Sequence, residues 1–150
     1  MDASAQGKLI TIGVGAVVLR GEDVLVIKRG KPPFLGQWSI PGGGLHYGEA
    51  IEDAVRREVR EETGVEIRIL GLIGVFEALP REAEGDGRRG HVVLVDYAAE
   101  WLSGEPIAGD DAADAAFVSV AEAISRLSWD KTRLAVARAI EIRDGAAKPL

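Results

Sequence analysis

One stretch, residues 39–65, constrains this chain more than any other, because a glycine triplet there leads into a strongly acidic segment. The triplet Gly42-Gly43-Gly44 permits a tight turn that side chains would block. The pattern after it predicts a helix over about residues 48–63, which Gly64 ends, as glycine often does just after a helix C-cap. The acidic residues of this helix and its approach are Glu49, Glu52, Asp53, Glu58, Glu61 and Glu62.

Three of these acids share one side of the predicted helix. With about 100° of rotation per residue, Glu62 lies about 40° to one side of Glu58, and Glu61 lies about 60° to the other. Like charges at this spacing weaken a helix by a few tenths of a kcal/mol per pair. A multivalent cation reverses that cost, and Mg²⁺ prefers carboxylate oxygens while completing its shell with water and substrate phosphates. The arc is therefore a candidate magnesium site.

The alternative is an acidic helix face that is simply exposed to water. Ile51, Ala54 and Val55 fall on the same side as Glu58 and Glu62, and that side must pack against something. The two acids are then expected at the edge of a buried stripe, where an unpaired carboxylate is costly. A mixed-charge solvent face is expected elsewhere on the helix, at Glu52, Asp53, Arg56 and Arg60.

The spacing of the stretch also resembles a known family. Gly43, five residues, Glu49, seven residues, Arg57-Glu58-Val59, one residue, Glu61-Glu62, one residue and Gly64-Val65 match the Nudix box at every defined position. The resemblance implies an α/β fold, an α/β/α sandwich with a mixed sheet, in a single Nudix domain over residues 1–150. It also implies hydrolysis, dependent on Mg²⁺ or alternatively Mn²⁺, of a nucleoside diphosphate linked to another group.

The same resemblance assigns roles to individual residues. Glu58, Glu62 and then Glu61 are implied as metal ligands, together with the loop carbonyl near Gly43. Glu49 is expected to support the site, and Arg57 to hold a box glutamate through its guanidinium fork rather than form a surface ion pair. Four further groups are expected to reach the substrate: the backbone of Gly42, Gly43 and Gly44, and the side chain of Arg81.

The general base varies within this family. It is either a glutamate of the box or an acidic residue from a later loop. Each loop acid also has the simpler reading of a side chain exposed to water. The candidates in this sequence are Asp110, Asp111, Asp114, Glu77 and Glu82.

The substrate is chosen by loops outside the box. Pro80 lies fifteen residues after Val65, a placement that resembles the ADP-ribose pyrophosphatase subgroup. This favours ADP-ribose, or a related nucleoside diphosphate sugar, as the substrate. The alternatives are a nucleoside triphosphate, oxidised or not, that yields pyrophosphate, and a nucleotide-binding module without catalysis. We expect a homodimer, although the chain lacks the long N-terminal extension that builds the dimer in that subgroup.

Composition narrows the class of protein. A chain of 150 residues fits one domain with a proper core. The net charge of -6 argues against nucleic acid as a partner, because non-specific binding to phosphates needs basic surface. The absence of cysteine excludes disulfides and zinc–thiolate sites. Neither a signal-peptide pattern nor a run long enough to span a membrane is present, so we expect a cytoplasmic protein.

The remaining elements follow from periodicity and turn residues. Strands are expected over residues 9–20, 24–28, 38–40, 66–78, 92–101 and 117–120, with a loop over 103–116. Ser119 and Glu122 have the capping-box spacing, which predicts a short helix to about Leu127. Asp130 is expected to cap a last helix over about residues 131–143. Its stripe of Leu134, Ala137 and Ile140 is expected to pack on the sheet.

Overall fold

The structure, a computed structural model, describes residues 9–31, 34–80 and 90–150. The strands within these ranges are β1 (Ile10–Arg20), β2 (Asp23–Arg29), β3 (Trp38–Ser39), β4 (Gly42–Gly44), β5 (Glu66–Ala78), β6 (His91–Ser103) and β7 (Ala112–Ser119). The helices are α1 (Ile51–Thr63), α2 (Val120–Arg126) and α3 (Asp130–Arg143). Among the described residues, none of the helices has the length and apolar character needed to cross a membrane.

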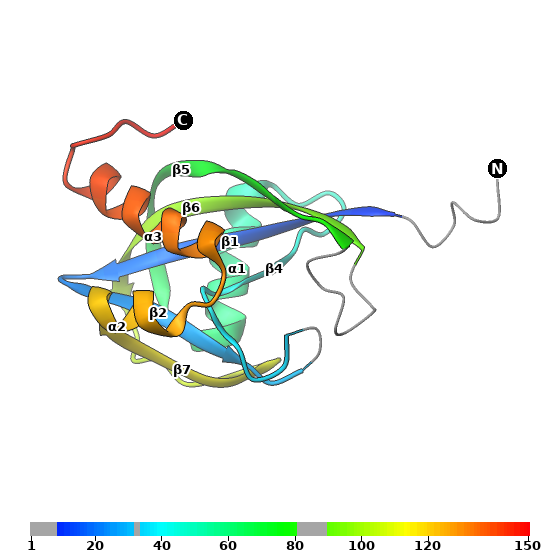
Figure 1. Cartoon of the computed structure of the whole chain (residues 1–150), viewed down its shortest axis with the longest axis horizontal. Helices are drawn as coiled ribbons and strands as arrows, with labels where there is room; N and C mark the ends of the chain where they lie inside the picture. The colour runs from blue at the N-terminus through cyan, green and yellow to red at the C-terminus, as the bar shows by residue number, and fades with distance from the viewer. Residues whose placement is uncertain (1–8, 32–33, 81–89) are drawn as a thin grey trace.

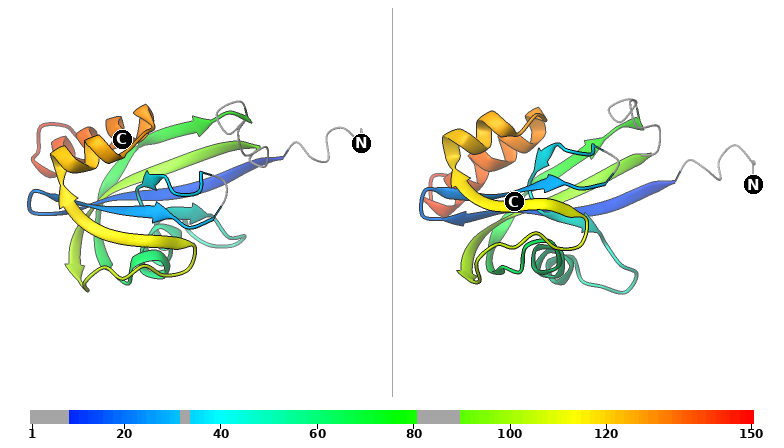
Figure 2. Two further views of the ribbon diagram at one scale, coloured as in Figure 1. Left: turned by 60° about the horizontal axis from the view of Figure 1, so that its bottom comes forward. Right: turned by 90° about the horizontal axis from the view of Figure 1, so that it is seen from below.

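The strands form one mixed sheet between helical layers. Its main order is β3-β2-β1-β6-β5, with β4 added to β1 and β7 to β2. β1 and β6 run parallel, while the other paired strands are antiparallel. Helices α2 and α3 cover one face and α1 covers the other, as the ribbon views show (Figure 1, Figure 2). The expected α/β/α sandwich with a mixed sheet is confirmed.

Alternation along the strands divides the apolar core between the two faces. Val14, Ala16 and Val18 of β1 pack toward α1, whereas Val17 and Leu19 pack toward α2 and α3. All five side chains are essentially inaccessible to solvent. Because successive side chains of a strand point to opposite faces, a continuous apolar run like this one can be buried on both sides.

The glycine triplet forms a strand, β4, and not the tight turn that we expected. β4 pairs antiparallel with β1, so that Gly42 lies opposite Gly15 and Gly44 lies opposite Gly13. The two backbones come very close, since a Cβ at Gly42 would lie 2.3 Å from the carbonyl oxygen of Val14. The glycines are therefore needed for close approach, and the chain turns afterwards, near Gly48, whose φ is 80°.

Helix α1 follows the expected pattern apart from its first turn. It begins at Ile51, later than the expected residue 48, and it ends at Gly64 in the left-handed conformation. Ala54 and Val55 are fully buried as expected, while Ile51 is exposed because it stands at the very start of the helix. The helix thus presents an apolar face to the sheet.

The C-terminal elements confirm one expectation and depart from two others. The predicted helix start at Ser119 is confirmed, since Ser119 Oγ accepts a hydrogen bond from the backbone N–H of Glu122 at 3.1 Å. However, Trp129 occupies the N-cap of α3, and Asp130 lies inside the helix. Of the expected stripe, Ile140 is partly buried and packs against the core, whereas Leu134 and Ala137 are exposed. The buried residues of α3 are Thr132, Ala135, Val136, Ala139 and Ile142. Small side chains let the helix approach the sheet closely, which selects this face over the leucine stripe.

The strand β7 is longer than the expected residues 117–120. It begins at Ala112 and pairs with β2 from Arg29 to Asp23. The segment is rich in alanine, a poor strand former, so pairing with an already buried strand decides its conformation.

Candidate active site

Helix α1 presses two acidic side chains against the glycine strand β4. Glu58 and Glu62 are buried, with 8% and 4% of their surface exposed. Glu62 Oε1 accepts a hydrogen bond of 2.7 Å from the backbone N–H of Gly42. The carboxyl group of Glu58 lies over Gly43, where any Cβ would come within 2.4 Å of it. A glycine at position 43 is therefore a steric requirement of the Glu58 position.

Arg57 links Glu49 and Glu61 to Glu58. Its Nε and Nη2 donate to the two oxygens of Glu49 at 2.7 and 3.0 Å. Its Nη1 donates to Glu58 at 2.7 Å and to Glu61 at 3.1 Å. The remaining donor reaches the carbonyl oxygen of Gly44 at 2.9 Å. All five N–H donors of the guanidinium are thus used, which fixes the orientation of the surrounding carboxylates.

The site carries more negative charge than its arginine compensates. Burial raises the pKa of Glu62 to about 7, and the charges of Glu58 and Asp110 add to the rise against the Gly42 hydrogen bond. Burial also raises the pKa of Glu58, although Arg57 opposes it. By contrast, the hydrogen bonds from Arg57 lower the pKa of the more exposed Glu49. The two buried carboxyls are therefore those for which a further cation is most favourable.

The donor set fits a hard divalent cation. Glu58, Glu61 and Glu62 supply carboxylate oxygens, and the Gly43 backbone lies against Glu58, which is the chemistry that Mg²⁺ and Mn²⁺ prefer. Among the described residues, no three His, Cys, Asp or Glu side chains are arranged closely enough to hold a metal ion together. Glu61 is turned toward Arg57 and Glu62 toward the Gly42 amide. Glu61 is exposed and can turn toward a cation without disturbing the core.

The structure separates the loop acids proposed as general base. The backbone N–H of Gly109 donates to the carbonyl oxygen of Glu62 at 2.9 Å, and this contact holds the neighbouring Asp110 near the site. Accordingly, the charge of Asp110 contributes to the raised pKa values of Glu58 and Glu62. Of the loop acids within the described residues, Asp110 is the one that the structure brings to the buried pair.

The other acids have different partners. Asp111 forms an ion pair with Lys31 at 2.9 Å, and Glu77 forms one with His91 at 2.8 Å. Asp114 Oδ1 accepts a hydrogen bond from the next backbone amide, that of Ala115. Arg81, which we expected to reach the substrate, and Glu82, a candidate general base, lie outside the described residues.

Comparison with known proteins settles the family. The sequence profile described as NUDIX domain matches residues 9–139. The chain belongs to the Nudix family. It is therefore a Nudix hydrolase, a pyrophosphohydrolase that acts on phosphoanhydride bonds. The acids on α1 and the glycine strand are its Nudix box.

Three similar proteins illustrate the range of the family. An ADP-ribose pyrophosphatase of Methanocaldococcus jannaschii is 33% identical over 123 residues, which are 82% of this chain and 69% of that protein. A Mycobacterium tuberculosis protein named "Putative 8-oxo-dGTP diphosphatase 2" is 37% identical over 100 residues, 66% of this chain and 67% of that one. The crystal structure of a MutT NUDIX hydrolase from Burkholderia pseudomallei superposes with a TM-score of 0.71 at 30% identity, covering 87% of this chain and 98% of that one.

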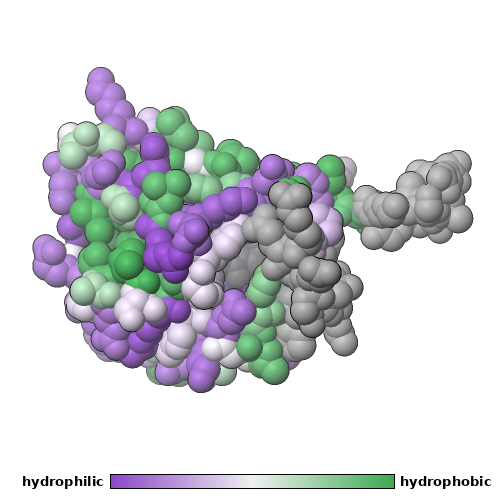
Figure 3. Space-filling view, viewed as in Figure 1, coloured by the Kyte–Doolittle hydropathy of each residue, from purple (hydrophilic) through white to green (hydrophobic). Residues whose placement is uncertain are grey.

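A cavity of about 790 Å³ lies beside the Nudix box. Its floor is the backbone of Gly13 and Gly15 in β1 with the strand β4, and its walls include Trp38, Trp129 and Asp96. It is open on the face that carries α2 and α3, opposite to α1; Figure 3 views this face, which is hollowed near its middle. The volume suits a nucleotide-sized ligand.

Asp96 is the site residue that sequence reasoning missed. It stands alone in an otherwise apolar strand, Val92-Val93-Leu94-Val95-Asp96, and it is 5% exposed. A single acid inside an apolar strand is the signal that could have identified it, because charged residues are rarely buried without a partner. Two tryptophans, Trp38 and Trp129, also line this cavity.

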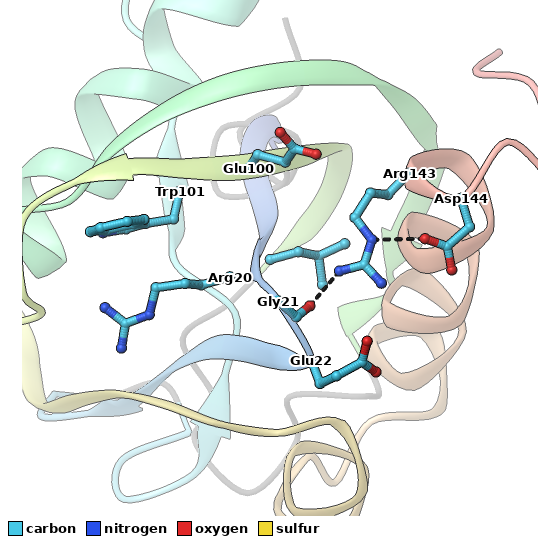
Figure 4. Close-up of a pocket in the computed structure, with 8 residues that line it drawn as sticks. Arg20, Gly21, Glu22, Glu100, Trp101, Arg143 and Asp144 are labelled. Carbon is cyan, nitrogen blue, oxygen red and sulfur yellow. Dashed lines mark hydrogen bonds and ion pairs between the residues drawn. The ribbon is translucent and has the colours of Figure 1, made fainter.

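A second cavity, of about 450 Å³, lies at the opposite end of β1 (Figure 4). Its two arginines already have partners within the protein. Arg143 donates to Asp144 and to the carbonyl oxygen of Gly21, and Arg20 pairs with Glu105 at 2.9 Å while stacking on the ring of Phe117. It lies apart from the Nudix box, and we assign no chemistry to it.

The buried Asp96 predicts a pH-dependent stability. Burial raises its pKa from the ordinary 3.8 to about 7. Below about pH 4 both the folded and the unfolded chain hold the proton, so no stability is lost. Between the two pKa values only the folded chain keeps the proton, so the free energy of unfolding falls as the pH rises through about 7. The expected loss is on the order of a few kcal/mol.

Asp96→Asn isolates this contribution, because Glu62 titrates in the same range in both proteins. Urea unfolding at pH 5 and pH 8 should show the variant gaining stability over wild type as the pH rises. A difference between the two proteins that is the same at both pH values would contradict the predicted titration of Asp96.

Proposed function

We propose that this Nudix hydrolase cleaves ADP-ribose, or a closely related nucleoside diphosphate sugar, to a nucleoside monophosphate and a sugar phosphate. The observation that carries the proposal is the buried pair Glu58 and Glu62, pressed against β4 directly beside a nucleotide-sized cavity. Similarity to an ADP-ribose pyrophosphatase over 82% of the chain favours this substrate. The placement of Pro80 agrees with it.

The two faces of the β1–β4 backbone bind different parts of the substrate in this proposal. The cavity takes the nucleoside, and the diphosphate is held at the acidic helix. Glu58, Glu61 and Glu62 would hold the divalent metal, with the Gly43 carbonyl beside them. When bound, the metal supplies charge neutralisation for the diphosphate and a more acidic attacking water. Arg57 keeps Glu49, Glu58 and Glu61 in place through its five hydrogen bonds.

We assign the general base to Asp110, the loop acid whose charge contributes to the raised pKa values of Glu58 and Glu62. Its φ of 52° is left-handed, a conformation that asparagine also tolerates. Asp110→Asn should therefore keep the loop intact and lower kcat by about 100-fold, within the range that general base catalysis supplies. The matched control is Asp111→Asn, which removes only the exposed pair with Lys31. Equal kcat values in the two variants would return the role to a glutamate of the box.

Product analysis with Mg²⁺ tests the substrate. ADP-ribose should give AMP and ribose 5-phosphate, and chelation of the metal by EDTA should abolish the reaction. The second candidate is a nucleoside triphosphate, which the similarity to the 8-oxo-dGTP diphosphatase favours. It would release pyrophosphate instead. A panel in which ADP-ribose is inert and 8-oxo-dGTP is cleaved would replace the first proposal by the second.

Tight nucleotide binding without turnover of any compound in the panel would instead indicate a binding module. The complete box argues against that outcome, because each acidic position is filled.

A homodimer and a cytoplasmic location complete the proposal. The sheet face toward α1 leaves apolar side chains uncovered beyond the helix. Ile10, Ile12 and Val75 are 63%, 46% and 63% exposed, and Ile12 and Val75 lie on either side of β6. Such a patch favours association with a second copy. Size-exclusion chromatography with light scattering tests it, and a monomer at all concentrations would refute the dimer.

A further inference from the structure

The cavity contains one side chain whose position the reaction at α1 does not explain. Asp96 lies on β6 opposite Gly15 of β1, and its Oδ1 stands 2.7 Å from where a Cβ of Gly15 would be. The carboxyl group therefore occupies space that the glycine leaves open, at the cavity floor beside Pro41 and Gly42. Val92 and Leu94 precede it on the same side of the strand and also line the cavity.

Within residues 9–31, 34–80 and 90–150, no hydrogen bond or ion pair reaches the Asp96 carboxyl group. Burial alone accounts for the raised pKa of this carboxyl, without a compensating charge. A buried polar group without a partner costs free energy, and this cost persists in proteins mainly where a ligand or water completes the hydrogen bonding. The Asp96 carboxyl group therefore has the features of a group that accepts a hydrogen bond from a bound ligand.

The surroundings define the chemistry of that donor. A phosphate matches Asp96 poorly, because an ionised carboxylate repels it and a carboxyl group has at most one proton to donate. In the proposed function the diphosphate is held at α1, on the other face of the sheet. The cavity that Asp96 lines is also lined by the aromatic residues Phe34, Trp38 and Trp129, which suit a flat ring more than a sugar. A carboxyl group accepts a hydrogen bond from an N–H whether or not it is ionised. The matching ligand group is an amino group on a planar base.

We propose that Asp96 is a specificity-determining residue that recognises the exocyclic amino group of an adenine base bound in the cavity. The inference rests on the proposed function, in that it takes the substrate to be an adenine nucleotide. It adds a position outside the Nudix box, on a different strand and on the other face of the sheet. Asp96 would choose the base, while the acids of α1 act on the diphosphate.

The test compares two ligands that differ only in the amino group. They are AMP and purine riboside 5′-monophosphate, in which hydrogen replaces the amino group. Neither contains a phosphoanhydride bond, so binding can be measured by calorimetry with Mg²⁺ present and without turnover. Wild type should bind AMP about tenfold more tightly, as expected for one hydrogen bond to a buried charged or acidic group. Asp96→Ala should bind both ligands equally.

Two further variants complete the design. Asp96→Asn keeps an acceptor oxygen and should retain part of the preference for AMP. This variant still tests the proposal if Asp96→Ala does not fold. Glu100 lies on the same strand, in an exposed ion pair with Arg68. Glu100→Gln should therefore keep the wild-type preference for AMP. Equal binding of the two ligands by wild type, or an unchanged preference in Asp96→Ala with a wild-type melting temperature, overturns the proposal.

Failure of the inference can be told apart from failure of the proposed function. A protein that hydrolyses ADP-ribose but does not distinguish the two monophosphates keeps its function and loses the role of Asp96. A protein that prefers AMP through Asp96 but leaves ADP-ribose intact keeps the adenine site and loses the proposed substrate.

Discussion

Replacing either Glu58 or Glu62 by glutamine should lower kcat by about 100-fold or more while the protein stays folded. Glutamine matches the size of glutamate but removes the anionic oxygen that a divalent cation needs. Stability should hold or rise slightly in the absence of metal, because burial of Glu62 penalises its charged form. Initial rates at saturating substrate and Mg²⁺, with thermal melts of each variant, measure both effects.

The matched control for these variants is Glu52→Gln. Glu52 lies on the same helix but is exposed, and its contact with Arg56 is 3.7 Å long. Exposed ion pairs of this kind contribute little to stability. Glu52 lies on the exposed side of the helix, away from β4. Its substitution should leave kcat unchanged. Wild-type turnover in the Glu58 or the Glu62 variant would exclude that residue from the metal site.

The second large effect is expected from a single methyl group on β4. In Gly43→Ala the new Cβ would stand 2.4 Å from the carboxyl carbon of Glu58, a distance that real Cβ contacts do not reach. Glu58 must then move, or β4 must separate from α1. Either change misplaces a ligand of the proposed metal, so we expect kcat to fall by about 100-fold, since small displacements at a reacting centre have effects of this size.

The neighbouring Gly44→Ala is the control. Its Cβ would meet no atom within 4 Å, and its φ is not in the left-handed region. The two variants thus add the same methyl group one residue apart, on opposite sides of the same strand. Gly44→Ala should keep kcat close to wild type, and the ratio of the two rates measures the steric argument directly. Similar rates would show that the Glu58 position is not held by the backbone of β4.

Much of the site was predictable because its spacing is local. The helix that carries Glu58, Glu61 and Glu62 has a fixed rotation per residue, so the three carboxylates had to share one arc. The apolar stripe of Ala54 and Val55 likewise placed Glu58 and Glu62 at a buried edge, and both are buried. The N-cap at Ser119 and the helix end at Gly64 were also predictable, since each depends on residues close in sequence.

Other features could not be predicted, because they depend on segments that meet only in the folded chain. The glycine triplet predicts a turn, and only its pairing with β1 makes it a strand. The alanine-rich start of β7 reads as a loop until β2 supplies its hydrogen bonds. On α3, either of two stripes can face a sheet, and contact with the sheet selected the small residues over Leu134.

The sequence by itself determined the chemistry of this protein: a family, a helix with acids on one arc, and a glycine triplet next to that helix. The tertiary structure alone decided which distant groups join that helix. It brought Asp110 to the buried glutamates through a loop that docks on the end of α1, and it placed Asp96 in a cavity floored by Gly13 and Gly15. The physical reason is that helical periodicity acts over a few residues, whereas the register of strands fixes neighbours about 80 residues apart in the chain, as for Gly15 and Asp96.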